Sequence, residues 1–176
     1  MTMDKHGQLT AEIAQSLKFE GFDVFYDHDI AGENVGKIVS AIKKEYHRED
    51  EFSQLDIAIV DKGSHVATAL VEIEETNDRP KAILGDIFGV LYGKHILFKG
   101  TPLKIGKFTT LIVAGMSQAD HEKRNKYLLK RIKKIKAVLG TKNSRIGRVM
   151  IKTYADEKEL SVELPALLER VVKGEK

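Results

Sequence analysis

The chain has 176 residues, a net charge of +3, 42% apolar residues and no cysteine, and its length predicts one domain over residues 1–176. The absence of cysteine excludes a disulfide scaffold, a Cys-type zinc or iron–sulfur site and a cysteine nucleophile. Because no stretch is apolar enough for a signal peptide or a membrane span, we expect a cytoplasmic protein.

Two helices and a strand are expected in the first part of the chain. Apolar residues spaced four apart predict a helix over residues 9–17, and the aromatic-rich segment 22–26 predicts a strand. Four apolar residues at helical spacing predict a second helix over residues 33–46: Val35, Ile38, Val39 and Ile42.

A β-hairpin followed by a helix is expected next. After the polar segment 47–54, the β-branched run 55–60 predicts a strand, and residues 61–64 have the composition of a turn. The run 66–74 then predicts the returning strand. A helix start signal before Pro80 and an apolar stripe predict a helix that ends at Gly93.

The remaining elements alternate between strands and helices. Following a loop rich in glycine and lysine, the apolar run 108–113 predicts a central strand covered on both faces. A long helix over 120–139, a strand over 149–154 and a last helix over 156–172 complete the chain. This order predicts a three-layer α/β domain with a mixed central sheet flanked by helices.

Positive charge is concentrated in residues 121–148, which carry +10 while the rest of the chain carries −7. Such a surplus favours contact with a polyanion, and nucleic acid, DNA above all, is the expected partner. The expected contact residues lie on the long helix: Lys123, Arg124, Lys126, Lys130, Arg131, Lys133 and Lys134. The alternative interpretation is the solvated face of an amphipathic helix.

Three carboxylates are expected to converge on the hairpin. Glu72 and Glu74 are two residues apart and therefore project from the same side of one strand. Asp56 precedes Ser64 by as many residues as Glu72 follows it, which predicts cross-strand neighbours. Because like charges repel, this grouping favours a divalent cation, and oxygen ligands suit Mg²⁺ or Mn²⁺. The alternative is a solvent-facing strand whose acids keep it soluble.

At these residues the sequence resembles the PD-(D/E)xK, or restriction endonuclease-like, nuclease superfamily. Asp56 matches the aspartate of the motif, preceded by Leu55 instead of proline, and Glu72-Ile73-Glu74 matches the second element with glutamate in place of lysine. Some restriction endonucleases of this superfamily have Glu-x-Glu at that site. The resemblance covers roughly residues 20 to 115 and implies a Mg²⁺-dependent endonuclease that hydrolyses DNA.

The resemblance also implies roles for individual residues. Asp56 and Glu72 would be metal ligands, together with the carbonyl of Ile73, and Glu74 would contact the attacking water. Lys81, in the first turn of the following helix, is the expected substitute for the motif lysine. An acidic residue of a preceding helix assists in some members, and Glu45 and Glu12 are both candidates for that role.

Several alternatives stay open. Asp86 is interpreted as a surface acid and Gly85 as a close-packing position in the same helix. A nuclease-fold protein that binds nucleic acid or a protein partner without cutting is the second functional hypothesis, because the motif lysine is missing. A protein–protein assembly module is the third. The sequence leaves the oligomeric state open, with a homodimer as one arrangement.

Overall fold

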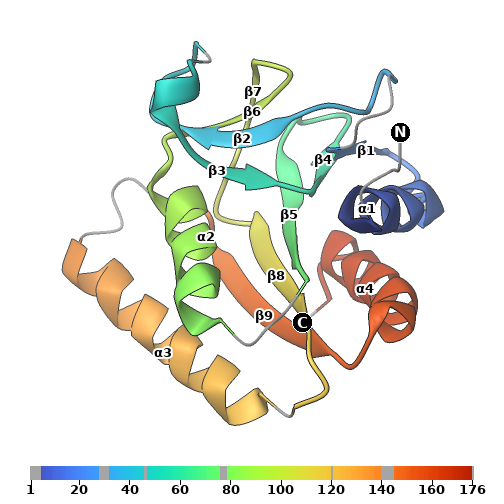
Figure 1. Ribbon diagram of the computed structural model, residues 1–176. Helices are drawn as coiled ribbons and strands as arrows, with labels where there is room; N and C mark the ends of the chain where they lie inside the picture. Colours follow the sequence, from blue (N-terminus) through green and yellow to red (C-terminus); the bar gives the residue numbers. More distant parts are fainter. Residues whose placement is uncertain are drawn as a thin grey trace.

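The computed structural model describes residues 5–27, 32–45, 47–75, 79–119, 121–139 and 145–175. These residues form an α/β protein (Figure 1). Its elements are α1 (Lys5–Ser16), β1 (Phe22–Tyr26), β2 (Ile38–Ala41), β3 (Glu51–Leu55), β4 (Ile57–Asp61), β5 (Ala67–Glu74), α2 (Pro80–Tyr92), β6 (His95–Phe98), β7 (Thr101–Leu103), β8 (Thr110–Met116), α3 (Glu122–Leu139), β9 (Arg148–Tyr154) and α4 (Glu157–Val172).

The larger sheet has five strands in the order β1-β4-β5-β8-β9. The pairs β1–β4 and β4–β5 are antiparallel, whereas β5–β8 and β8–β9 are parallel, so the sheet is mixed. In the predicted hairpin, Ile57 lies opposite Val71 and Ala58 opposite Leu70. Asp56 directly precedes β4 and lies outside these pairs; its N–H donates to the Val71 carbonyl at 3.0 Å, so the ladder does not continue to the predicted pair of Asp56 and Glu72.

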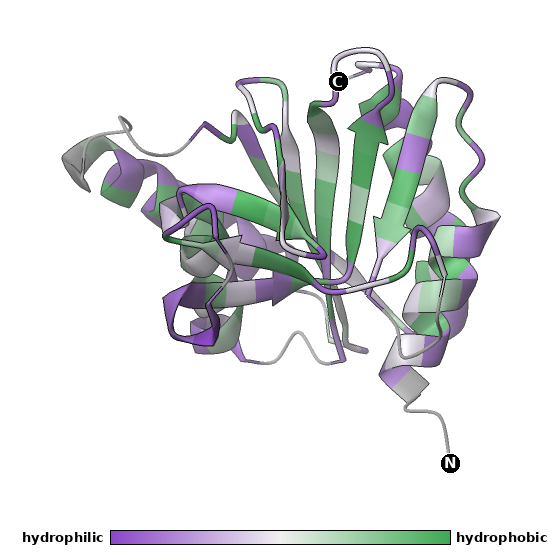
Figure 2. Cartoon of the chain, turned by 90° about the horizontal axis from the view of Figure 1, so that it is seen from above, coloured by the Kyte–Doolittle hydropathy of each residue, from purple (hydrophilic) through white to green (hydrophobic). Residues whose placement is uncertain are grey.

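Helices cover both faces of this sheet. On one face, α1 and α4 pack their apolar side chains against Ile57, Ile59 and Val71. On the other, α2 and α3 pack against Leu70 and Leu111. Figure 2 shows the hydrophobic strands in the middle and hydrophilic residues on the outside of the helices. Among the described helices, none has the length and apolar character needed to cross a membrane.

A second sheet of four antiparallel strands, β3-β2-β6-β7, lies above α2 in Figure 1. Ile38, Leu55 and Ile96 from this sheet join the same core cluster as α2. Its outer strand β3 packs on α2, where the Ser40 hydroxyl of the neighbouring strand donates to the Gly89 carbonyl at 2.8 Å. The prediction of one central sheet is therefore incomplete, because part of the chain builds this second layer.

The predicted helix over 33–46 is wrong, since this segment contains the strand β2. All four residues of β2 are buried, because both faces of the strand are covered. Ile38 faces the core shared with α2, whereas Val39 belongs to a separate hydrophobic cluster on the other face. In a short strand that is covered on both faces, apolar and polar residues do not alternate, so the apolar residues can match the spacing of a helix. The β-branched residues at all four apolar positions were the signal that favoured a strand.

β6 and β7 form an antiparallel hairpin in the segment for which the sequence predicts a loop rich in glycine and lysine. Its two turn residues, Lys99 and Gly100, have φ values of +48° and +77°. Positive φ at both central residues is the geometry of a type I′ turn, whose twist matches that of the flanking strands. The apolar run of β6 before Lys-Gly was the hairpin signal.

Two glycines of α2 test how closely the second sheet packs on this helix. A Cβ on Gly89 would lie 2.7 Å from the Ser53 Cβ and 3.1 Å from the Phe52 carbonyl oxygen, whereas a Cβ on Gly85 has nothing within 4 Å. Gly85 is therefore not the close-packing position that the sequence suggested.

We expect Gly85→Ala to raise the free energy of unfolding by about 0.5–1 kcal/mol, because alanine favours the helix. We expect Gly89→Ala to lower it by about 1–3 kcal/mol, because overpacking exceeds that gain. Chemical denaturation of both variants measures the difference, and equal effects would contradict this packing.

Candidate metal centre

The acidic cluster consists of Glu72, Glu74 and Asp86. One carboxylate oxygen from each lies within 4.8 Å of the others. Glu72 and Glu74 project from the α2-facing side of β5, the face that also carries Leu70. Asp86 lies in the middle of α2, next to the fully buried Ile87 that anchors the helix on the sheet. The expected pair Glu72 and Glu74 is thus brought together, and Asp86 is a member that the sequence interpretation assigned to the surface.

The cluster is electrostatically strained in the absence of a cation. Burial, together with the charges of Asp56 and Asp86, raises the pKa of Glu72 from 4.5 to about 10. Burial and a hydrogen bond with Asp86 raise the pKa of Glu74 to about 7. Both shifts have the direction that desolvation and like charges produce. A positive charge at this point would stabilise the ionised carboxylates.

Two carboxylate oxygens of the cluster have no hydrogen-bond partner among the described residues. They are Glu72 Oε2 and Asp86 Oδ2, and both are buried. A buried acceptor without a partner is costly, and a bound cation would satisfy both oxygens. Three carboxylates without histidine or cysteine fit a hard divalent ion such as Mg²⁺ or Mn²⁺. The three carboxylates therefore fit Mg²⁺ or Mn²⁺, the ions that the sequence predicted.

Asp56 adjoins this cluster but is not one of its three members. Its Oδ2 accepts a hydrogen bond from the Ile73 N–H at 2.6 Å, and its Oδ1 lies 2.9 Å from His6 Nε2 of α1. Both oxygens of the Asp56 carboxylate thus have partners within the protein. The group of described residues that is suited to a metal contains Asp86 where the sequence had placed Asp56.

The other residues expected near the site are exposed. Lys81 lies in the first turn of α2. Glu12 is exposed on α1, and Glu45 is exposed in the segment after β2 that was expected to be helical. Neither belongs to the group of three.

A cavity of about 430 Å³ opens beside the cluster. Glu72 and Asp86 line one side, and residues of the second sheet, including Lys37, Arg48 and Phe52, line the other. Lys37 Nζ forms an ion pair with Glu51 Oε2 at 2.9 Å, while Arg48 lies exposed in the turn before β3. Sequence reasoning missed these residues because it assigned residues 33–46 to a helix and 47–54 to a polar connection.

The basic residues of the long helix are placed as expected on α3. Lys123, Lys126, Lys130, Arg131, Lys133 and Lys134 are exposed, and Arg124 is half-buried. Lys126 forms an ion pair with Glu122 of the same helix. Leu128 and Ile132 form the buried stripe of α3. In Figure 1, α2 lies between α3 and β3, so the basic surface and the cavity lie on different sides of α2.

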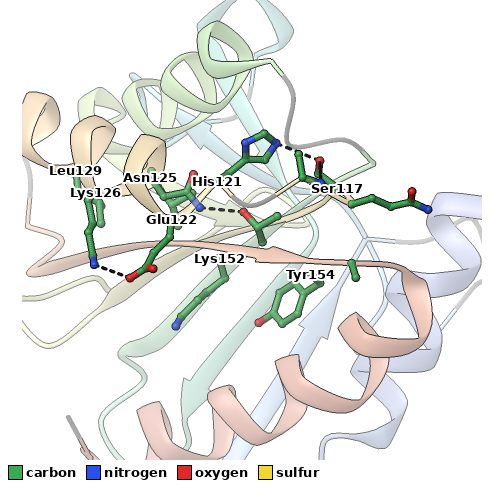
Figure 3. Close-up of a pocket in the computed structure, with 13 residues that line it drawn as sticks. Ser117, His121, Glu122, Asn125, Lys126, Leu129, Lys152 and Tyr154 are labelled. Atoms are coloured by element: carbon green, nitrogen blue, oxygen red, sulfur yellow. Dashed lines mark hydrogen bonds and ion pairs between the residues drawn. The ribbon is translucent and has the colours of Figure 1, made fainter.

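A second cavity, of about 510 Å³, lies between the end of β8, the start of α3 and β9 (Figure 3). Ser117 Oγ lies 3.0 Å from His121 Nε2 and accepts a hydrogen bond from the Ala119 N–H at 3.2 Å. Asn125 Nδ2 donates to Thr153 Oγ1 at 2.9 Å. These bonds hold the turn into α3 and attach the helix to β9, so these polar groups serve the fold.

The raised pKa values predict how stability depends on pH when divalent cations are removed. An unfolded glutamate loses its proton near pH 4.5, whereas the folded pKa is about 7 for Glu74 and about 10 for Glu72. Between these values the folded state binds more protons than the unfolded state, so raising the pH favours unfolding. We expect the Tm in EDTA to fall from pH 5 to pH 9, less steeply above pH 7.

Glu72→Gln provides the control for this dependence. Glutamine does not titrate, so the variant should show a smaller decrease of Tm over the same pH range. An equal decrease in both proteins would contradict the raised pKa of Glu72.

Comparisons of the chain with protein-family models, with curated proteins and with solved structures gave no match.

Proposed function

We propose that this protein is a metal-dependent nuclease that hydrolyses phosphodiester bonds of DNA. The observation that carries the proposal is the cluster of Glu72, Glu74 and Asp86, with two buried carboxylate oxygens that lack partners, at the edge of an open cavity. Such a donor set suits a cation that binds substrate phosphate. The order of β4, β5, α2 and β8, with β5 and β8 parallel, supports a restriction endonuclease-like arrangement.

In this proposal Glu72 and Asp86, whose buried oxygens lack partners among the described residues, would hold Mg²⁺ or Mn²⁺, with Glu74 beside them. When bound, such an ion polarises the phosphodiester, lowers the pKa of a bound water and stabilises the leaving oxygen. Because Glu72 holds a proton at neutral pH without the ion, binding releases that proton, and affinity for the ion rises with pH.

The chain's own residues have distinct parts in the proposed reaction. Glu74, the third carboxylate of the cluster, would accept the proton of the attacking water. The water oxygen bonds to phosphorus while the bond from phosphorus to the leaving oxygen breaks, and the leaving oxygen takes up a proton from solvent. Asp56 positions the strand that carries both glutamates, since it binds the Ile73 N–H between them.

Cleavage of labelled single-stranded and double-stranded DNA tests the proposal directly. We expect cutting with Mg²⁺ or Mn²⁺ and none in EDTA, and a Tm that rises when either ion is added. Saturation at a hundred times the dissociation constant would add about 2.7 kcal/mol to the free energy of unfolding. No cutting with any divalent cation would overturn the proposal.

One observation favours the second candidate function, a nuclease-fold protein that binds nucleic acid without cutting it. Glu74 occupies the position of the motif lysine in the sequence, and no lysine belongs to that motif here. DNA binding without cleavage under any of these conditions would support this function.

A further inference from the structure

A third cavity lies between α3 and the start of β9, away from the acidic cluster. Its volume of about 510 Å³ lies in the range of about 300–1,000 Å³ that is typical of ligand-binding cavities. The described residues that line it come from α3 and from residues 147–149, and none comes from β8. Among the described strands, β9 is the last of the larger sheet and pairs only with β8 (Figure 1). The cavity therefore borders the unpaired edge of β9.

Apolar side chains form the floor of this cavity. Leu129, Ile132 and Ala137 line it from α3. Val149 lines it from β9. Leu129 and Val149 are only half-buried, although both pack against the hydrophobic core. An apolar side chain that entered the cavity would remove this exposed apolar surface from water, which favours binding.

The charged residues that line the cavity are all basic among those described. They are Lys133, Lys136 and Arg148. The surrounding chain supplies no acid, because residues 123–155 contain neither aspartate nor glutamate. Burial lowers the pKa of Lys136, whose Nζ donates to the Ile146 carbonyl at 3.2 Å. A carboxylate that reached this rim would therefore meet positive charge that no described acid neutralises.

The edge of β9 also offers backbone groups for pairing. Successive residues of a strand direct their N–H and C=O groups alternately to its two sides. The Tyr154 carbonyl accepts from the N–H of Ser117, which directly follows β8, so the backbone groups of Tyr154 face β8. By this alternation the backbone groups of Val149 and Ile151 face the open edge. An extended peptide can add to such an edge as a further strand.

We propose that α3 and the edge of β9 form a docking site for an extended acidic peptide of a partner protein. The peptide pairs with β9 at Val149 and Ile151 and places an apolar side chain in the cavity. Its carboxylates contact Lys133, Lys136 and Arg148. A second copy of this chain is a poorer occupant, because its own β9 would bring the same positive charge to the edge. DNA is also poorer, because it has no aliphatic side chain for the apolar floor.

Fluorescence anisotropy with designed peptides tests each part of this recognition. The probe is a short fluorescein-labelled peptide with a centre of valine and leucine between two aspartate-rich ends. We expect the full chain to bind it. Replacing the aspartates by asparagine should weaken binding at least about tenfold, the value of one hydrogen bond to a charged group. Replacing valine and leucine by serine should weaken it as much, and N-methylation of alternate amides by about fivefold.

Two substitutions in the cavity locate the binding surface. Ala137 is exposed, and Ala137→Glu places a carboxylate at the rim, where it repels aspartate and occupies the cations. We expect this variant to bind the probe at least about tenfold more weakly than the wild type. Arg148→Gln should weaken binding about tenfold, because it removes one of the three cations.

Matched controls make the same changes of charge elsewhere. Val162 is 67% exposed on α4, so Val162→Glu adds a carboxylate to another exposed apolar position of a helix. Arg145 is exposed and does not line the cavity, so Arg145→Gln removes a nearby cation from outside it. Both controls should bind the probe as the wild type does, and unchanged Tm values verify that all four variants fold.

The possible occupants give different results. Binding that needs the aspartates, the apolar centre and the free amides, and that Ala137→Glu weakens, supports the docking site whether or not the protein cleaves DNA. No binding of the probe, or an equal loss in Val162→Glu, overturns it. Dimerisation in sedimentation experiments that Ala137→Glu abolishes, without probe binding, assigns the surface to a second copy instead. Loss of single-stranded DNA binding in Ala137→Glu, without probe binding, assigns it to nucleic acid.

Discussion

Asp86→Asn and Glu72→Gln should each abolish metal-dependent DNA cleavage while leaving the protein folded. Each change replaces a charged oxygen ligand by a neutral amide of the same shape. Loss of a partner outside the ligand sphere already costs about 10–100-fold in metal affinity or activity, so loss of a direct ligand should cost at least a hundredfold. Initial rates with a labelled substrate at several Mg²⁺ concentrations measure this effect.

Stability measurements separate this effect from misfolding. Asp86→Asn removes a charge from the cluster, and Glu72→Gln removes a buried glutamate that must be protonated on folding, so both variants should have a Tm in EDTA at least as high as that of the wild type at pH 8. Mg²⁺ should raise the Tm of the wild type much more than that of either variant. Glu163→Gln, on the exposed surface of α4, is the control and should behave as the wild type in both assays. Wild-type rates in Asp86→Asn would show that Asp86 is not a ligand.

Asp56→Ala should have a different signature from these two substitutions. Alanine has no oxygen to accept the hydrogen bond that the Ile73 N–H donates to Asp56 Oδ2, so this buried donor would lose its partner. If Asp56 positions β5, as proposed, Asp56→Ala should lower the Tm in EDTA, in contrast to Glu72→Gln. A raised Tm together with a lost Mg²⁺ effect would instead make Asp56 a ligand, as the family resemblance implies.

Neutralising three lysines of α3 should reduce DNA affinity at least about tenfold and weaken its dependence on salt. Lys130, Lys133 and Lys134 are exposed on one helix, and each should release about one counterion from DNA that it contacts. Replacing all three by glutamine should decrease the slope of log affinity against log salt by about 2–3 for duplex DNA. Fluorescence anisotropy from 50 to 300 mM NaCl measures both quantities.

The control for this experiment changes the net charge by the same amount elsewhere. Lys18, Lys62 and Lys158 are exposed outside α3, and their replacement by glutamine removes three charges from other surfaces. An unchanged slope in the α3 variant, or equal changes in both variants, would show that α3 is not a specific contact surface. The lysines of α3 would then be the solvated face of an amphipathic helix.

The sequence by itself determined the elements whose signals are local. The hairpin of β4 and β5 follows from a turn between two β-branched runs, and its register is set by that turn. The helices α3 and α4 follow from apolar stripes at helical spacing, and Glu72 and Glu74 share a face because side chains alternate along a strand. These features depend on residues a few positions apart.

Only the tertiary structure decided which distant groups meet at the site. Asp86 joins Glu72 and Glu74 because α2 packs on β5, and His6 reaches Asp56 from a helix 50 residues away. Arg48 and β3 border the cavity beside the cluster because β2, β3, β6 and β7 form a second sheet on α2. Packing overrides local pattern in such short buried strands, since burial on both faces removes the alternation on which sequence prediction relies.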